Sequence, residues 1–156
     1  MVFIFEMDGV LVDNHKWHFE AWVEFGKKHG IEISAEDFSK YFGSTNHQVL
    51  VSLFGKCISD EELKILGDEK EAIYRQIYQA FIRPVDGLPE FLQYISDRGI
   101  PIALATSAPP ENVEFTLNAI GLKKYFNLIT DSSMVTRGKP DPQVYLLTAA
   151  KLGVEP

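Results

Sequence analysis

The sequence has little of what disulfide-bonded, membrane-spanning or nucleic-acid-binding proteins need. Cys57 is the only cysteine among 156 residues, so no intramolecular disulfide can form, and we expect a cytoplasmic protein. The apolar N-terminal run 1–5 is too short for a signal peptide or a membrane span. The net charge of −7 argues against a broad nucleic-acid-binding surface and against anionic membranes. We therefore expect neither nucleic acid nor a membrane as a partner.

The composition is that of a folded globular protein. Apolar residues make up 46% of the chain and charged residues 24%, which excludes a disordered polar segment. A chain of this length can bury a sizeable core, and we expect a monomer.

A short strand followed by a long helical block is the predicted order of the first half. Residues 2–5 are apolar β-formers that end at a polar loop, and a helix is expected over 14–29 with Asn14 as its N-cap. Capping boxes at 34–37 and 59–62 predict further helices that reach about 42 and 81, with another helix over 47–54 between them.

After Pro84 the pattern changes to alternating helices and strands. Helices are expected over 88–98, 111–119 and 143–152, and apolar strands over 100–105 and 128–129. This alternation predicts an α/β fold with a parallel sheet and right-handed crossovers. We expect an α/β core made of residues 1–13 and 85–156, and an α-helical insertion over residues 14–84.

Polar side chains follow three of the apolar segments. Glu6 and Asp8 come after the first strand, Thr106 and Ser107 after the second, and Lys139 lies in the loop beyond the third. Ligands of open α/β sheets bind at the carboxyl ends of the strands, so these groups are candidates for one site. Carboxylates can attack, move a proton or bind a metal, while a hydroxyl and a lysine can hold phosphate oxygens.

These segments resemble the motifs of the haloacid dehalogenase superfamily. The first motif resembles Glu6-Met7-Asp8-Gly9-Val10-Leu11-Val12-Asp13, the second Ile102-Ala103-Leu104-Ala105-Thr106-Ser107, and the third Lys139-Pro140-Asp141-Pro142. Their order, with helices after the first motif, is similar to the branch of β-phosphoglucomutase-like proteins. The resemblance implies a Rossmann-like parallel-sheet core with an inserted α-helical cap.

The resemblance also implies roles for the core residues. Glu6 stands at the position of the nucleophile, and Asp8 at that of the general acid/base. Thr106 and Lys139 would bind the phosphoryl oxygens, with backbone N–H groups from Gly9 and Ser107. The resemblance implies Mg²⁺ as cofactor, with Glu6 and the backbone carbonyl of Asp8 as its ligands.

In the helical insertion, the resemblance points to four more residues. His18 and Trp22 match an H-x-x-A-W segment of the branch, in which the histidine supports the acid/base. Lys70 and Asn46 fall at positions that lie near the substrate, although the mutase has an arginine near the position of Asn46. This departure leaves a phosphatase as plausible as a phosphohexomutase.

Two further departures affect the expected activity. Glutamate at position 6 is one methylene longer than the family's aspartate, and a displacement of about 1 Å can cost roughly 10²-fold in rate. The motif that completes the magnesium site in the family is not found before residue 156, so we expect that the C-terminal part of the core is missing.

Structural interpretations of the same residues remain open. Glu6 and Asp8 could form a solvated turn, Lys139 an ordinary surface lysine, and Lys70 a solvated lysine paired with acidic neighbours. His18 could be a packed core histidine and Trp22 part of the core of the insertion.

The function expected from the sequence is Mg-dependent phosphoryl transfer on a small phosphorylated metabolite, through an acyl-phosphate intermediate. Glu6 would impair this reaction. The alternative is a catalytically inactive protein that binds phosphate or a sugar phosphate.

Overall fold

The computed structural model describes residues 1–41, 43–55 and 57–155. Two compact units make up the chain: one comprises residues 1–13 and 82–156, and the other residues 14–81. Below, these are called the sheet unit and the helical unit.

In the described residues of the sheet unit, 1–13 and 82–155, three parallel strands pair in the order β1-β2-β3. β1 spans Phe3–Phe5, β2 Ile102–Ala105 and β3 Leu128–Thr130. Phe5 pairs with Leu104, and Leu104 pairs with Ile129, so the three strands end at one edge of the sheet. The predicted α/β class with a parallel sheet is confirmed.

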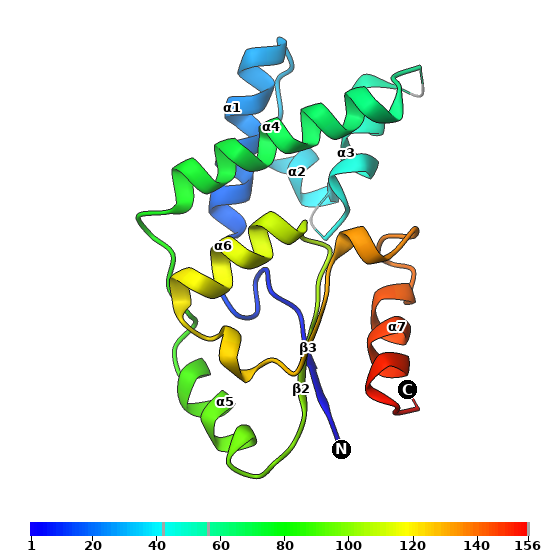
Figure 1. Cartoon of the computed structure of the whole chain (residues 1–156). Helices are drawn as coiled ribbons and strands as arrows, with labels where there is room; N and C mark the ends of the chain where they lie inside the picture. Colours follow the sequence, from blue (N-terminus) through cyan, green and yellow to red (C-terminus); the bar gives the residue numbers. More distant parts are fainter. Residues whose placement is uncertain (42, 56, 156) are drawn as a thin grey trace. The chain divides into compact units, whose positions relative to one another are not determined.

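Helices cover both faces of this sheet (Figure 1). α5 (Leu88–Ser96) and α6 (Pro110–Ile120) lie on one side of the strands, and α7 (Gln143–Leu152) lies on the other. Leu92 of α5 and Leu117 of α6 are fully buried beside Leu104 of β2 in one apolar cluster. Short 3₁₀ turns at Lys123–Tyr125 and Ser132–Met134 flank β3, and the sequence pattern did not indicate them.

Four helices are formed by the described part of the helical unit, residues 14–41, 43–55 and 57–81. They are α1 (His15–His29), α2 (Ala35–Tyr41), α3 (Asn46–Phe54) and α4 (Asp60–Tyr78). α1 and α4 pack against each other, and their apolar faces join α2 and α3 around Trp22, Phe25 and Leu50. Residue 42, the predicted end of the second helix, lies outside the described residues.

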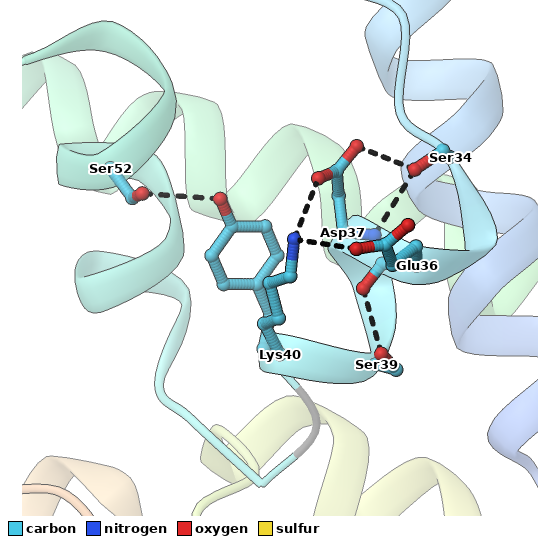
Figure 2. A network of polar contacts seen from close by, with 7 residues as sticks. Ser34, Glu36, Asp37, Ser39, Lys40 and Ser52 are labelled. Atoms are coloured by element: carbon cyan, nitrogen blue, oxygen red, sulfur yellow. Dashed lines mark hydrogen bonds and ion pairs between the residues drawn. The ribbon is translucent and has the colours of Figure 1, made fainter.

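Side-chain caps explain several of these helix starts. Ser59 and Glu62 form the predicted capping box of α4, and Thr45 and Gln48 form another at α3. At α2, the Ser34 hydroxyl accepts the N–H of Asp37 and donates to its carboxylate (Figure 2).

The sequence predicts the start of α1 correctly but not the end of α4. Asn14 occupies the predicted N-cap position of α1, but its side chain makes no cap hydrogen bond; its amide N–H donates to the Tyr74 hydroxyl at 2.8 Å. α4 ends at Tyr78 and not at 81. None of the helices in the described ranges is long and apolar enough to span a bilayer.

Candidate active site

Glu6 and Thr106 meet at the carboxyl edge of the sheet. Each residue directly follows a strand, and the parallel register of β1 and β2 brings the two strand ends side by side. The Thr106 hydroxyl donates a 2.6 Å hydrogen bond to Glu6 Oε1. This bond joins two residues that are 100 positions apart in the sequence. They lie at the carboxyl ends of parallel strands, where open α/β sheets bind their ligands.

Lys139 completes this contact from the loop that precedes α7. Its ammonium forms an ion pair with the second carboxylate oxygen, Glu6 Oε2. The side chains of Lys139 and Glu6 are only 22% and 17% exposed, so water screens this pair less than it would a surface pair. Glu6, Thr106 and Lys139 are called the oxyanion cradle below.

The Thr106 side chain is held in place on both sides. It is fully buried, and its hydroxyl oxygen accepts the N–H of Ala108 at 3.1 Å while its proton goes to Glu6. Its backbone N–H donates to the carbonyl of Thr130 on the neighbouring strand at 3.0 Å. These bonds fix the orientation of the hydroxyl toward Glu6.

The turn after β1 is closed by its own backbone. Asp8 is half-buried, and Gly9 has a φ of 75°, a conformation that glycine adopts without steric cost. The N–H of Gly9 donates to Val12 O at 2.9 Å, and that of Leu11 donates to Met7 O at 2.9 Å. These backbone groups, expected to hold phosphate, are therefore used within the turn. The sequence motif predicts a tight turn, but it does not predict which acceptor each backbone N–H of the turn binds.

Two residues at the end of β1 have the chemistry of a magnesium site. The Glu6 carboxylate and the backbone carbonyl of Asp8 offer hard oxygen atoms, and Mg²⁺ is commonly held by one or two carboxylates, with water and substrate phosphate as its other ligands. Each oxygen of Glu6 already has one partner but retains a second lone pair. Within the described ranges, no group of three or more His, Cys, Asp or Glu residues is placed to hold a metal ion.

In the helical unit, Lys70 is the centre of a buried polar cluster. Its ammonium lies 2.8 Å from Glu71 Oε1 and 3.1 Å from His18 Nδ1. The ammonium also lies 5.0 Å from the centre of a Trp22 ring, and Asn46 donates to the same Glu71 oxygen at 2.8 Å. The structure thus brings together the four residues predicted from this unit. A solvated Lys70 is excluded, because the residue is only 2% exposed.

Sequence reasoning missed three members of this cluster. Glu71 neutralises Lys70, Tyr74 stacks on the His18 ring at 3.9 Å, and Asn14 donates to the Tyr74 hydroxyl. Positions 67, 70, 71, 74 and 78 are all buried on α4. Their helical spacing was a signal that could have marked the polar members as part of a buried face.

The structure is that of a parallel α/β protein in which a carboxylate, a hydroxyl and a lysine meet at the carboxyl edge of the sheet. The chain belongs to the haloacid dehalogenase-like hydrolases, whose family model matches residues 1–156. A phosphorylated carbohydrates phosphatase of Thermotoga maritima is 28% identical, over 98% of this chain and 71% of that protein. The β-phosphoglucomutase of Bacillus subtilis is 29% identical, over 98% of this chain and 70% of that protein.

Structural similarity agrees with this assignment. The crystal structure of β-phosphoglucomutase from Clostridium difficile superposes with a TM-score of 0.87 at 26% identity. The superposition covers 98% of this chain and 71% of that structure.

Proposed function

We propose that this protein is a phosphoryl-transfer enzyme that acts on a small phosphorylated carbohydrate, as a phosphatase or a phosphohexomutase. The observation that carries this proposal is the oxyanion cradle, in which Thr106 and Lys139 both engage the Glu6 carboxylate. The names of the similar proteins, a phosphatase of phosphorylated carbohydrates and a β-phosphoglucomutase, support the substrate class.

The proposed reaction has two steps. A carboxylate oxygen at position 6 forms a bond to phosphorus while the bond from phosphorus to the leaving oxygen breaks, and Asp8 gives that oxygen a proton. In the second step, water or a sugar hydroxyl attacks the acyl phosphate, Asp8 takes its proton, and the carboxylate is released.

The other two residues of the cradle, Thr106 and Lys139, are proposed to stabilise negative charge on the phosphoryl group. Thr106 and Lys139 are proposed to hold the phosphoryl oxygens and to stabilise the charge that develops on them. Mg²⁺, held by the Glu6 carboxylate and the backbone carbonyl of Asp8, would neutralise part of the phosphate charge.

The helical unit is proposed to be the cap, with His18, Trp22, Asn46 and Lys70 as substrate-binding or supporting residues. His18 and Asn46 are joined by hydrogen bonds through Lys70 and Glu71, so this cluster can act as one preorganised set.

A second function, phosphate binding without turnover, is favoured by one specific observation. Both oxygens of Glu6 are bonded, one to the Thr106 hydroxyl and one to the Lys139 ammonium, which reduces the carboxylate's nucleophilicity. Glutamate also places its carboxylate one methylene further along the side chain than aspartate would, and in-line attack tolerates little displacement.

The test is a phosphate-release assay over sugar phosphates, nucleotides and pyrophosphate, with and without Mg²⁺. The Glu6 protein is compared with Glu6→Asp, and Glu6→Asp/Asp8→Asn is the matched control that lacks the acid/base. We expect Mg²⁺-dependent turnover in Glu6→Asp that is roughly 10²-fold or more above the Glu6 protein, and its loss in the control. A mutase is detected in the same samples by following conversion between hexose phosphates. Turnover in none of them, with phosphate binding retained, would establish the binding function instead.

A further inference from the structure

The hydroxyl donor of the oxyanion cradle is already in use, and so is one of the three N–H donors of Lys139. Thr106 has a single hydroxyl proton, which it donates to Glu6 Oε1, and its oxygen accepts the N–H of Ala108. A bound oxyanion can receive this proton only if Glu6 gives it up.

The positive charge of the cradle, on Lys139, is likewise balanced by Glu6. The Lys139 ammonium pairs with Glu6 Oε2, and its other described neighbour is the ring of Tyr145, whose centre is 5.6 Å away. One cation therefore faces one carboxylate, and the cradle offers an incoming anion no net positive charge while Glu6 is in place.

We propose that Glu6 is an internal ligand of the cradle, and that a tetrahedral oxyanion such as inorganic phosphate engages Thr106 and Lys139 together only by displacing its carboxylate. The inference rests on the proposed function, since it concerns the same oxyanion site. The two carboxylate oxygens meet the same pair of donors that two oxygens of a phosphoryl group would use. The bound carboxylate and an incoming phosphate dianion also repel each other.

The length of the side chain at position 6 decides whether its carboxylate can compete with phosphate for Thr106 and Lys139. β1 is paired with β2, so the backbone at position 6 is held in place next to the strand end. An aspartate there would be shorter by one carbon–carbon bond of about 1.5 Å. The contact of Thr106 with Glu6 is already at hydrogen-bonding distance, 2.6 Å, so the shorter side chain cannot keep both contacts without a backbone shift.

The experiment measures the affinity for inorganic phosphate by calorimetry, without Mg²⁺ and at fixed ionic strength. Glu6→Gln removes the charge and keeps the shape, so we expect phosphate to bind about 10- to 100-fold more tightly than to the Glu6 protein. Glu6→Asp keeps the charge but shortens the reach, and an intermediate gain is expected. Lys139→Met in the Glu6→Gln background should abolish the gain in phosphate affinity, since it removes the cation that pairs with Glu6 in the parent protein and would pair with phosphate in Glu6→Gln.

The matched control is Asp13→Asn. Asp13 is an exposed carboxylate of the same segment, so its loss changes the net charge equally without freeing a cradle donor. A change of less than about twofold is expected there, because exposed charges are screened by salt. Equal affinities in the Glu6 and Glu6→Gln proteins, or an equal gain in Asp13→Asn, would overturn the inference. Phosphate binding to no variant at all would remove the oxyanion site itself and, with it, the proposed function.

Discussion

Lys70 and Glu71, adjacent residues of α4, form an ion pair of 2.8 Å in which both side chains are almost completely buried. Neighbouring residues on a helix do not normally face each other, so the pair depends on the surrounding packing. His18 on α1 contacts Lys70, and Asn46 at the start of α3 contacts Glu71. The pair therefore links α1, α3 and α4 of the helical unit.

Removing one member of this pair should destabilise the helical unit strongly. Lys70→Met removes the ammonium that faces the buried Glu71 carboxylate at 2.8 Å, and we expect a loss of about 3–5 kcal/mol in the free energy of unfolding. Glu71→Gln, which leaves the cation, should cost a similar amount. Urea unfolding followed by tryptophan fluorescence measures this directly, because both tryptophans, Trp17 and Trp22, lie in the helical unit.

The double variant Lys70→Met/Glu71→Leu is the control for this prediction. Apolar replacement of both partners removes the buried charges together, so most of the lost stability should return. A double variant that is as unstable as the sum of the single variants would contradict the assigned pairing.

Two buried glycines of the helical unit should respond to alanine with opposite signs. At Gly26, a Cβ atom would lie 2.4 Å from the backbone oxygen of Ile31, and this oxygen cannot rotate away. Gly26→Ala should therefore cost about 1–3 kcal/mol of stability. At Gly67, in the middle of α4, the Cβ atom would lie 3.6 Å from Asn46 Cβ, which is ordinary contact.

Gly67→Ala should then stabilise the protein by about 0.5–1 kcal/mol, because alanine loses less backbone entropy in a helix. Thermal unfolding of the two variants and the parent provides the comparison. If both variants shift the melting temperature in the same direction, the packing described around one of these glycines is wrong.

The capping contact at α2 predicts a pH dependence in the acid range. The hydrogen bond from the Ser34 hydroxyl, with Lys40 nearby, holds the pKa of Asp37 below its ordinary value of 3.8 (Figure 2). A depressed pKa in the folded state means that this stabilisation is present above the unfolded value and is lost as the pH falls through the folded pKa. Carboxyl NMR titration measures the pKa itself.

Ser34→Ala is the matched variant for this titration. It removes the largest cause of the shift, so the Asp37 pKa should rise toward 3.8. The Glu62 pKa, which Ser59 lowers in the same way at α4, should not move in this variant. An Asp37 pKa that is insensitive to Ser34 would exclude the capping contact in solution.

Two of the three cradle residues, Glu6 and Thr106, could be predicted from the sequence because each directly follows an apolar strand. The apolar runs before Glu6 and Thr106 predict parallel strands, and parallel strands end at the same edge. Lys139 was placed by motif alone, since 133 residues separate it from Glu6 and no local pattern measures that distance.

The cluster around Lys70 was less predictable. The acidic residues next to it suggested a solvated surface, and only the packing of α1 against α4 buries it with Glu71. Asn14 shows the same limit. Local preference favours an N-cap bond for asparagine, but the Asn14 side chain makes none and its amide N–H donates to a tertiary partner, Tyr74.

Thr106 offers a test that separates structure from chemistry. Thr106→Val has nearly the same shape, but it leaves the N–H of Ala108 and one oxygen of Glu6 without the hydroxyl that now bonds both. A buried N–H without a partner costs about 1–3 kcal/mol, so unfolding should become easier by that amount. Thr106→Ser keeps the hydroxyl and loses one methyl group, which should cost about 0.8 kcal/mol.

The same two variants, made in the Glu6→Asp background, should differ in turnover. Thr106→Val removes the hydroxyl that we propose donates to the transferring phosphoryl group, and we expect kcat to fall about 10²- to 10³-fold. Thr106→Ser should stay within about tenfold of its parent, since a serine hydroxyl can make the same bond. If Thr106→Val loses stability but keeps the parent's kcat, the hydroxyl only supports the strand end, and the phosphoryl oxygens are held by other groups.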